Sequence, residues 1–444
     1  MKVNNIEKPT GAKLALGIDV GTTSLSASVV ELDGKTAIET FNLDGSGFID
    51  SSIPNAKLQD PDAIFDKAKS LIDSILGKYA EISVIGITGQ MHGILYCDKD
   101  GKAVSPLATW QDGRADLPTK TGGSYCDEIF AITGRRVFPG YGLATHYYNL
   151  KNSLVPQNAV SLCTVMDYLA MRLCGLDRPI SHVTNAHSLG LFDTENGVFD
   201  VQSIIKLGID EKMLPRVTAE SEIVGSYSQI PVAVAIGDNQ ASFLGAIDDE
   251  ESSVLANYGT GSQISCVSTA PHSSKHIECR PYVDGKYLLC GSALCGGRAY
   301  AILERFFNSF CRDAFGDGKS KYDALNKLAS EGFGKIEPLD VCTKFSGERA
   351  DPDLRGSIMG LSEENFTPAA LTLGVLYGMA RELEEMYREM NCGGKDLLVT
   401  SGNVARKNPV FADILADVFG MEVTLTEGKE EAATGAAKFA STAT

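Results

Sequence analysis

One carboxylate stands at the place where a buried strand gives way to a helix. The apolar run at 232–236 is typical of a buried strand; it ends at Gly237, and Asp238 follows directly, before a helix-like segment of small residues to Ala246. Open α/β proteins place their chemistry at such corners, and a glycine lets a ligand approach the backbone. On this stretch alone the simpler interpretation of Asp238 is an N-cap, whereas the rest of the chain favours a catalytic base.

Two segments carry glycine and hydroxyl residues between expected strands. In the first, a strand at 14–20 leads through a polar tip to a second strand at 25–32; this tip consists of Gly21, Thr22, Thr23 and Ser24. The pattern returns later at one constant offset, so that Asp19, Gly21, Thr22 and Ser24 match Asn257, Gly259, Thr260 and Ser262. Tips of this kind offer N–H and hydroxyl donors to phosphate. One such tip alone would also suit an ordinary hairpin, but the repetition predicts a duplicated domain that holds two ends of a polyphosphate.

A second group of polar residues suits a polyhydroxyl ligand. Gln90 and His92 lie between Gly89 and Gly93 at the end of an expected strand at 82–88, where His92 is a candidate hydrogen-bond donor to a ligand. The segment 108–114 contains Trp110, Gln111, Asp112 and Arg114. An aromatic face, an amide and a carboxylate are what the wall of a sugar site needs. The alternative is that Trp110 is a core residue and that Asp112 pairs with Arg114 on the surface.

The later part of the chain carries glycines at expected helix starts. The segment 291–298, which includes Gly297, is expected to open a helix that continues through Phe307, and a glycine there would let a ligand approach closely. A short strand at 397–400 is followed by Gly402, Asn403 and Arg406 and then by a helix through Phe419. This order predicts a nucleotide pocket in which Arg406 stacks on a base, although a solvated arginine is the simpler alternative.

The elements that must position these residues are expected to form two α/β domains, because a chain of 444 residues is longer than one hydrophobic core ordinarily supports. Helices are expected over 61–79, 166–173, 369–390 and 430–440, the last rich in alanine and closely packed through Gly435. The charged segment 247–253 is expected to be the boundary. We therefore predict an N-terminal domain over 13–246 and a C-terminal domain over 247–444.

Composition excludes several classes of function. Forty Lys and Arg against 57 Asp and Glu give a net charge of −17, which disfavours nucleic acid and anionic membranes as partners. No apolar run approaches the ~18 residues of a membrane span. The 11 cysteines form no Cys-x-x-Cys pair, and residues 1–12 resemble neither a signal nor a transit peptide. These features predict reduced thiols in a cytoplasmic protein. Residues 17–24 also lack the Gly-Lys-Ser/Thr of a P-loop.

Taken together, these motifs resemble the FGGY family of carbohydrate kinases, over nearly the whole chain and in family order. The matching stretches are 17–24 and 257–262 for phosphate, 401–409 for adenosine, 89–93 for sugar and 237–240 for the catalytic base. The resemblance implies two actin-like (ribonuclease H-like) domains facing across a cleft, with sugar bound by the N-terminal domain and ATP by the C-terminal one. Stretches such as 109–114, 142–145 and 184–188 are most similar to the sedoheptulokinase group, while His146 and the segment 356–361 depart from the family pattern.

The resemblance also implies roles for individual residues. Asp238 would be the general base that accepts the proton of the terminal hydroxyl of a ketose. The implied ketose is sedoheptulose, and D-xylulose or another pentulose is the alternative. The substrate-binding candidates are Gln90, Met91, His92, Gln111, Asp112 and Asn239. The ATP-binding candidates are Gly21, Thr22, Thr23, Ser24, Gly259, Thr260, Gly261, Gly297, Gly402, Asn403 and Arg406. Asp19 would hold Mg²⁺ through water, and the protein would be a monomer or a homodimer.

An alternative from another class is an ATP-switched binding protein, like the actin or heat-shock-chaperone members of the superfamily. Such a protein would hydrolyse ATP slowly without a sugar and pass the motion to a partner. The sugar-type residues at 89–93 and 109–114 argue against it. Hydrolysis of ATP that no ketose accelerates would favour it.

Overall fold

A computed structural model describes residues 13–33, 36–120, 122–348, 351–426, 428 and 430–443. Residues 1–12, for which the sequence predicts no targeting peptide, lie outside this part of the chain. The chain divides into two compact units. Unit 1 comprises Met1–Ala246, Pro281–Gly285 and Gly428–Thr444, and unit 2 comprises Ile247–Arg280 and Lys286–Glu427.

Unit 1 is built on a six-stranded sheet of order β13-β14-β5-β1-β2-β3. Its strands are β1 (Leu14–Val20), β2 (Ser24–Glu31), β3 (Thr36–Asp44), β5 (Ile82–Gly89), β13 (Ile223–Tyr227) and β14 (Ile230–Ala233). The first three form an antiparallel meander, and β5 and β14 join it in parallel to β1. Strands β1 and β5 are almost continuously apolar and buried, as expected of strands covered on both faces.

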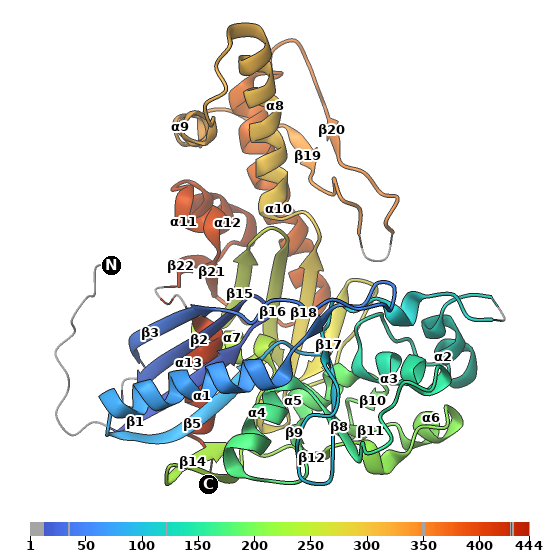
Figure 1. Cartoon of the computed structure of the whole chain (residues 1–444). Helices are drawn as coiled ribbons and strands as arrows, with labels where there is room; N and C mark the ends of the chain where they lie inside the picture. The colour runs from blue at the N-terminus through green and yellow to red at the C-terminus, as the bar shows by residue number, and fades with distance from the viewer. Residues whose placement is uncertain are drawn as a thin grey trace. The chain divides into compact units, whose positions relative to one another are not determined.

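One face of this sheet is covered by α1 (Pro61–Lys78) and α4 (Val165–Cys174). Helix α1 begins where the sequence predicts, because Asp60 caps it by accepting hydrogen bonds from the N–H groups of Asp62 and Ala63 and Pro61 occupies its first turn. Its buried residues follow one helical face: Ile64, Ala68, Leu71, Ile72 and Ile75. Figure 1 shows α1 lying along the strands of this sheet.

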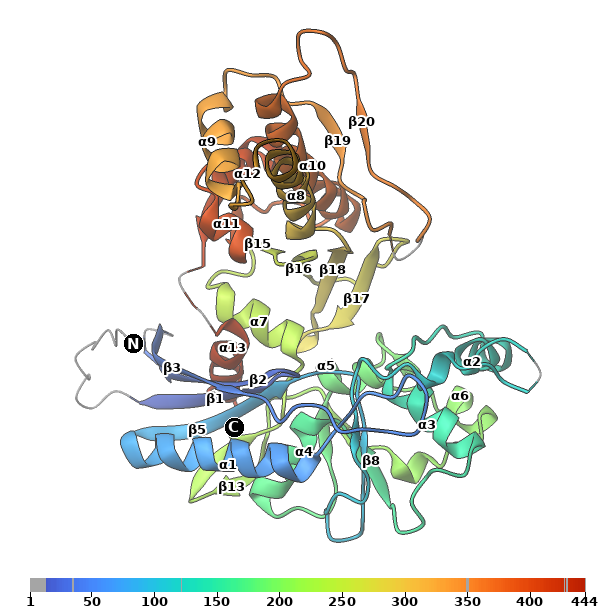
Figure 2. The ribbon, with the colours of Figure 1, turned by 45° about the horizontal axis from the view of Figure 1, so that its top comes forward.

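The other face is covered by α7 (Asp238–Ala246) and α13 (Glu431–Ala440), which lie side by side in Figure 2. Glycines permit this close approach. A Cβ on Gly17 of β1 would lie 1.8 Å from the carbonyl oxygen of Ala433, and one on Gly435 would lie 1.7 Å from that of Ala241. Gly435 therefore allows the tight packing that its alanine-rich setting predicts.

The position of α13 differs from the division drawn from the sequence. The sequence assigns all of 247–444 to the second domain, whereas the structure groups Gly428–Thr444 with unit 1. The reason is burial: α13 contributes Ala437 and Ala440 to the same apolar cluster as Ala15 of β1 and Val84 of β5. The break after Ala246 coincides with the predicted boundary.

Unit 2 repeats this plan with a sheet of order β17-β18-β16-β15-β21-β22. The strands are β15 (Ser253–Tyr258), β16 (Ser262–Ser268), β17 (Ile277–Pro281), β18 (Tyr287–Ala293), β21 (Leu397–Ser401) and β22 (Glu422–Leu425). β15 and β16 form a hairpin, and β21 lies parallel to β15 as β5 does to β1. Tyr258 pairs with Ser262 where Val20 pairs with Leu25, so the second tip is one residue shorter than the first.

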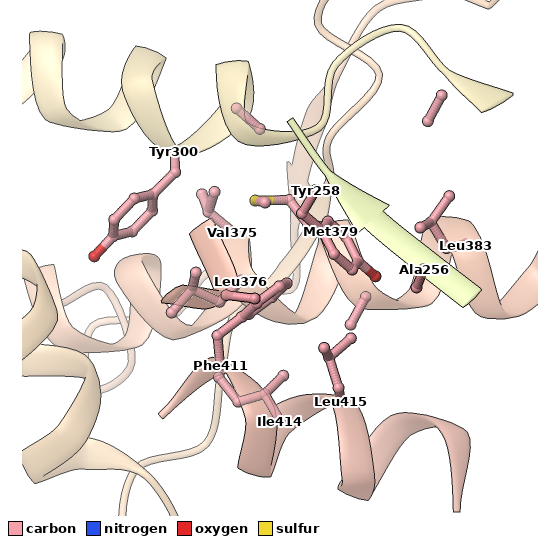
Figure 3. Packing of buried hydrophobic residues seen from close by; sticks show 14 of the residues in the cluster. Ala256, Tyr258, Tyr300, Val375, Leu376, Met379, Leu383, Phe411, Ile414 and Leu415 are labelled. Atoms are coloured by element: carbon pink, nitrogen blue, oxygen red, sulfur yellow. The ribbon is translucent and has the colours of Figure 1, made fainter. Parts of the chain in front are cut away.

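The core of unit 2 lies between this sheet and its helices (Figure 3). The helices are α8 (Gly297–Phe315), α9 (Tyr322–Gly332), α10 (Pro368–Met390), α11 (Asn403–Lys407) and α12 (Phe411–Phe419). Tyr258 of β15 meets Phe411 of α12 edge-on, with ring centroids 4.8 Å apart, and both rings are fully buried. Leu376 and Met379 from α10 belong to the same cluster.

The remaining elements are short and mostly connect the sheets to the sites described below. In unit 1 they are β4 (Leu58–Gln59), β6 (Leu95–Cys97), β7 (Leu107–Ala108), η1 (Arg114–Asp116), α2 (Tyr125–Thr133), α3 (Gly142–Lys151), β8 (Ser161–Cys163), β9 (Ile180–His182), α5 (Val183–Ala186), η2 (His187–Leu189), β10 (Phe192–Asp193), β11 (Val198–Phe199), α6 (Val201–Lys206), η3 (Glu211–Met213), β12 (Arg216–Thr218) and η4 (Val283–Gly285). In unit 2 they are β19 (Asp340–Cys342) and β20 (Ser357–Met359). None of the helices in the described part of the chain is both long and apolar enough to span a bilayer.

Candidate functional site

Asp238 is the first residue of α7 and is partly exposed. The chain reaches it through a buried segment that follows β14, where the Ile236 N–H donates to Ile87 at 3.0 Å and the Thr88 hydroxyl donates to the Ile236 carbonyl at 2.8 Å. Asn239 lies beside the carboxylate, its Nδ2 donating to Asp238 Oδ1 at 2.7 Å. The end of β5 thus fixes the backbone from which the Asp238 carboxylate projects.

Three carboxyl groups of unit 1 influence one another. Burial, the charge of Asp238 and the charge of Glu430 together raise the pKa of Asp19 to about 7. Because like charges disfavour ionisation, a cation near Asp19 would relieve this repulsion. Among the residues that the structure describes, no group of three or more His, Cys, Asp or Glu side chains is arranged to hold a metal ion directly. The binding of Mg²⁺ by Asp19 through water remains a prediction.

A closed set of hydrogen bonds joins the first polar tip to the sugar-type residues. The Thr22 hydroxyl donates to Gln90 Oε1 at 3.3 Å, and Gln90 Nε2 donates to Gln59 Oε1 at 2.8 Å. Gln59 Nε2 donates to the Thr22 carbonyl at 2.8 Å, which closes the set. The indole Nε1 of Trp110 donates to the Thr22 hydroxyl at 2.9 Å. Trp110 is 47% exposed while Gln59 and Gln90 are buried. The network therefore holds an accessible aromatic face in a fixed place.

His92 adopts a left-handed backbone conformation with φ of 72°. Its ring Nδ1 lies 2.7 Å from the carbonyl oxygen of Ser188, and the ring stacks on Tyr141 at 4.6 Å and 12°. A carbonyl can only accept, so Nδ1 carries the proton and Nε2 of the neutral ring is an acceptor. A neutral ring would therefore accept from a sugar hydroxyl and a protonated ring would donate to one, so the donor role that the sequence suggests for His92 remains a prediction.

The glycines on either side of His92 have a structural reason. A Cβ on Gly89 would lie 2.6 Å from the Val20 carbonyl oxygen, and one on Gly93 would lie 2.4 Å from that of Ala108. Met91 is buried, and its Sδ accepts a hydrogen bond from Asn239 Nδ2 at 3.8 Å. Met91 thus contacts Asn239, the residue next to Asp238.

Asp112 is fully buried and pairs with a buried arginine, whereas the sequence suggests either a sugar ligand or a surface pair. Its Oδ1 accepts from Arg114 N and Nε, and its Oδ2 accepts from Arg114 Nη2 and Lys57 N, at 2.8–3.1 Å. Both oxygens are thus occupied by protein donors, and the Arg114 side chain is also bonded to Asn149 at 2.8 Å. Asp112 orders the turn that carries Trp110 and the exposed Gln111.

In unit 2 the second polar tip lines a hollow of about 480 Å³. Its lining residues are Asn257, Gly259, Thr260, Gly261, Ser262, Gln263, Ser292, Ala293 and Leu294. Asn257 is anchored by a hydrogen bond from its Nδ2 to the Ser401 hydroxyl at 2.8 Å. A Cβ on Gly261 would lie 2.8 Å from the Ala293 carbonyl oxygen, so glycine is required for the tip to close against β18. Three predicted ATP-binding residues, Gly259, Thr260 and Gly261, meet here.

Gly297 and Gly402 belong to the same part of unit 2. The Gly297 N–H donates to the Gly259 carbonyl at 2.8 Å, so the start of α8 contacts the tip. That helix starts later than the sequence suggests, because Gly291 and its neighbours pair with β16 as part of β18. A Cβ on Gly402, whose φ is 98°, would lie 2.4 Å from the Tyr258 carbonyl oxygen.

Asn403 and Arg406 lie on the exposed side of α11, just beyond Gly402. The Arg406 guanidinium donates from Nη2 to the Thr426 hydroxyl at 3.1 Å. This bond holds the side chain beside the loop that follows β22. Stacking of Arg406 on a base remains a prediction.

Two residues of the unit 1 site are absent from the sequence-based set. Gln59 lies in a loop-rich region with no motif, and only the folded structure shows that it bonds to both Thr22 and Gln90. Glu430 precedes α13 and receives a hydrogen bond from Asn42 Nδ2 at 3.1 Å. No local sequence signal connects Glu430 with Asp19, because the two meet only when α13 covers the sheet.

Comparison with known proteins places the chain among sugar kinases. Residues 14–256 match the family model for the FGGY family of carbohydrate kinases, N-terminal domain, and residues 254–444 match that for the C-terminal domain. Mouse (Mus musculus) sedoheptulokinase is 26% identical over 467 residues, covering 96% of each chain. Glycerol kinase of Alteromonas mediterranea is 28% identical over 414 residues, covering 85% of this chain and 80% of its own length.

The fold is also that of solved sugar kinases. The crystal structure of xylulose kinase from Rhodospirillum rubrum superposes with a TM-score of 0.80 at 21% identity, covering 97% of this chain and 89% of that one. The two-domain actin-like fold implied by the sequence motifs is thereby confirmed.

Proposed function

Because the chain belongs to the FGGY family of carbohydrate kinases, we propose that it transfers the γ-phosphoryl group of ATP to the terminal primary hydroxyl of a ketose. Sedoheptulose, giving sedoheptulose 7-phosphate, is the first candidate, and D-xylulose or another pentulose is the alternative. Its similarity to sedoheptulokinase along nearly the full length of both chains supports the first choice. The observation that carries the proposal is the carboxylate of Asp238 at the start of α7, in the same unit as the ordered Trp110–Thr22–Gln90 network.

In this mechanism Asp238 accepts the proton of the attacking sugar hydroxyl. A base positioned for this purpose contributes about 10²–10⁴-fold to the rate. Asn239 orients the carboxylate through its hydrogen bond to Oδ1, and Met91 supports Asn239. The base therefore has a fixed direction before the substrate binds, which is the condition for efficient proton transfer.

The sugar is held by groups of complementary hydrogen-bonding type. The Nε2 atom of a neutral His92 accepts from a hydroxyl, and the exposed amide of Gln111 can donate or accept. Asn239 directs its Nδ2 to Asp238 and Met91, so it would bind the sugar as an acceptor through Oδ1. The exposed face of Trp110 packs on the apolar side of the carbon chain. Asp112 has no place in direct contact, since its oxygens are occupied by Arg114 and Lys57.

The nucleotide is held mainly by backbone donors. The tips at 21–24 and 259–262 supply N–H and hydroxyl groups to the polyphosphate, and the segment 402–406 receives the adenosine. A net charge of −17 means that anionic side chains outnumber cationic ones, so the chain as a whole does not offset the charge of the phosphates. Mg²⁺, when bound, offsets charge on the phosphates, and Asp19 would hold it through water.

The test is an ADP-release assay with purified protein and Mg-ATP across sedoheptulose, xylulose, ribulose, fructose, gluconate and glycerol. We expect the highest kcat/KM with sedoheptulose. A higher value with a five-carbon ketose would replace the substrate and keep the reaction. ATP hydrolysis that no sugar accelerates would overturn the kinase proposal and favour an ATP-switched binding protein.

A further inference from the structure

A chain of hydrogen bonds connects the backbone before Asp238 with a buried segment outside the proposed site. The Gly237 N–H donates to the Thr184 hydroxyl oxygen at 3.0 Å, and Thr184 is fully buried on α5. Thr184 Oγ1 lies 2.8 Å from Nδ1 of His182, and Nε2 of that ring lies 3.1 Å from the carbonyl oxygen of Ala219. The chain of bonds thus runs from the corner at Asp238 to the loop between β12 and β13.

The direction of each bond in this chain is set. A backbone carbonyl can only accept, so Nε2 of His182 carries the proton and donates to Ala219. Burial lowers the pKa of His182 to about 4, so the ring is uncharged at neutral pH and Nδ1 is an acceptor. The Thr184 hydroxyl therefore donates to Nδ1, and its oxygen accepts from the Gly237 N–H. His182 thereby fixes the direction of the Thr184 hydroxyl.

The peptide group between Ile236 and Gly237 is held at both of its polar atoms. Its N–H donates to Thr184, and its carbonyl accepts from the Thr88 hydroxyl at 2.8 Å. Thr88 lies on β5 and Thr184 on α5, so the two hydroxyls belong to different elements. Strand β14 ends at Ala233, before this peptide group. Side chains therefore help to set the orientation of the peptide group where the strand has already ended.

Glycine at position 237 makes these bonds important. A glycine backbone can adopt many conformations, and a Cβ there would lie 2.6 Å from Gln240 Oε1 and 3.0 Å from Met91 Cε, so a larger side chain has no room. On its other side the Gly237 carbonyl accepts from the Ala241 N–H of α7 at 2.9 Å. The direction of Asp238 thus depends on the bonds made by the peptide groups on either side of Gly237.

We propose that Thr184 is a positioning residue for Asp238 and that His182 orients its hydroxyl. The role rests on the proposed kinase function, in which Asp238 is the base. Thr184 acts through the backbone, by its hydrogen bond to the residue before the base. Without this acceptor the peptide group can rotate, and the carboxylate loses the direction needed for proton transfer. Loss of Thr184 should therefore lower kcat more than it weakens substrate binding.

The test compares Thr184→Val with Thr184→Ser in the ADP-release assay, with Mg-ATP and the sugar of highest kcat/KM. Valine keeps the shape of the side chain and removes the acceptor, whereas serine keeps the hydroxyl. We expect kcat to fall on the order of tenfold in Thr184→Val, with the KM of each substrate changed less than about threefold, because only the transition state loses an interaction. Thr184→Ser should stay within about threefold of the wild-type kcat.

Thr372→Val is the matched control. Thr372 is also a fully buried threonine, on α10 of unit 2, and its hydroxyl donates to the Pro368 carbonyl at 2.7 Å. Its kcat should equal that of the wild type, whatever the change in its melting temperature, which is measured for every variant. A purely structural role of Thr184 would likewise lower the melting temperature and leave the kcat of the folded protein unchanged.

A second pair of variants tests His182 and does not require Thr184→Val to fold. His182→Leu keeps the Thr184 hydroxyl but removes the acceptor that directs its proton, whereas the amide oxygen in His182→Asn can take the place of Nδ1. We expect kcat to fall at least roughly threefold in His182→Leu and less in His182→Asn.

The outcomes separate this role from the proposed function. Wild-type kcat in folded Thr184→Val would overturn the role of Thr184, and wild-type kcat in folded His182→Leu would overturn that of His182. In both cases the kinase function stands. A wild-type protein without sugar-dependent ADP release would overturn the proposed function, and the positioning role with it.

Discussion

The indole nitrogen of Trp110 donates a hydrogen bond to the hydroxyl of Thr22 over 2.9 Å. An aromatic side chain of the proposed sugar site is thereby fixed by the tip of the first hairpin, which is proposed to bind phosphate. The proposed sugar-binding and phosphate-binding residues of unit 1 are therefore joined by this hydrogen bond. Loss of this bond should affect both substrates.

Trp110→Phe keeps an aromatic face and removes the hydrogen bond to Thr22. Since such a bond contributes about 1 kcal/mol, the KM of the sugar should rise roughly fivefold. Trp110→Ala removes the face as well and should raise KM further, with little change in the melting temperature because the side chain is 47% exposed. Steady-state kinetics with each substrate varied in turn measures this, and equal constants for Phe, Ala and wild type would refute a sugar wall.

Gln59 should act as a positioning residue. Gln59→Met keeps the size of the side chain but leaves Gln90 Nε2 and the Thr22 carbonyl without their partner, so the free energy of unfolding should fall by about 1–3 kcal/mol. Gln59→Glu keeps an acceptor for Gln90 and should recover part of the loss. Urea unfolding and the KM of both substrates are the measurements. Wild-type KM values in a folded Gln59→Met protein would show that the network is structural only.

Asp238→Asn should fold and bind ATP normally yet lose turnover. The amide keeps the shape of the side chain but cannot accept the proton of the sugar hydroxyl, so kcat should fall by at least about 10²-fold. Sugar-dependent ADP release and ATP binding by calorimetry test this. The control is Asp50→Asn, at an exposed position of unit 1, which should have wild-type kcat. Near-normal ADP release by Asp238→Asn would exclude Asp238 as the base.

Gly402→Ala should damage the nucleotide site more than a matched glycine does. Gly402 and Gly394 both have positive φ, 98° and 86°, so alanine costs about 1–2 kcal/mol at each. A Cβ on Gly402 would additionally lie 2.4 Å from the Tyr258 carbonyl, whereas one on Gly394 meets nothing within 4 Å. We expect the KM of ATP to rise on the order of tenfold in Gly402→Ala alone. Similar KM values in both variants would place the nucleotide elsewhere.

Acid should destabilise the protein through two buried histidines. Burial lowers the pKa of His146 and of His182 to about 4, from an ordinary value of 6.5. Between these values the unfolded chain binds protons that the folded chain does not. The stabilising effect of each neutral histidine is therefore complete above pH 6.5 and is lost as the pH falls toward 4, by on the order of 3 kcal/mol each.

The measurement is urea unfolding between pH 7 and pH 5 for the wild type and His182→Gln. Asp167 acts in the opposite direction, because burial raises its pKa to about 7 and its protonated form favours the folded state as the pH falls. The difference between variant and wild type cancels this contribution. The variant should depend less steeply on pH, and identical slopes would show that His182 is not the titrating group.

Much of the fold follows from local pattern. The two hairpins and α1 follow from the pattern of neighbouring residues, so the sequence predicts them. The sequence also predicts tight packing at Gly435, but not that α7 is the partner. What it does not predict depends on contacts between distant segments. Asp112 was a candidate ligand because its neighbours are polar, but the fold closes Arg114 and Lys57 around it.

The proposed site shows the same limit. The glycine–hydroxyl tips have recognisable composition, and each follows a strand as expected. The Gly237–Asp238 corner is also recognisable, but β14 ends at Ala233, so the strand expected over 232–236 stops before Gly237. No sequence pattern marks Gln59 or Glu430, because their roles depend only on where β4 and α13 lie in the fold. The proton on Nδ1 of His92 is also placed from outside its motif, by the carbonyl of Ser188.

The return of α13 to unit 1 has a consequence for how the chain is made. During synthesis every residue of unit 2 leaves the ribosome before Glu431–Ala440 does. Unit 2 can therefore fold while the sheet of unit 1 still has an open apolar face at Gly17 and Gly86. The unit that begins first is therefore completed last, when α13 emerges and covers this face.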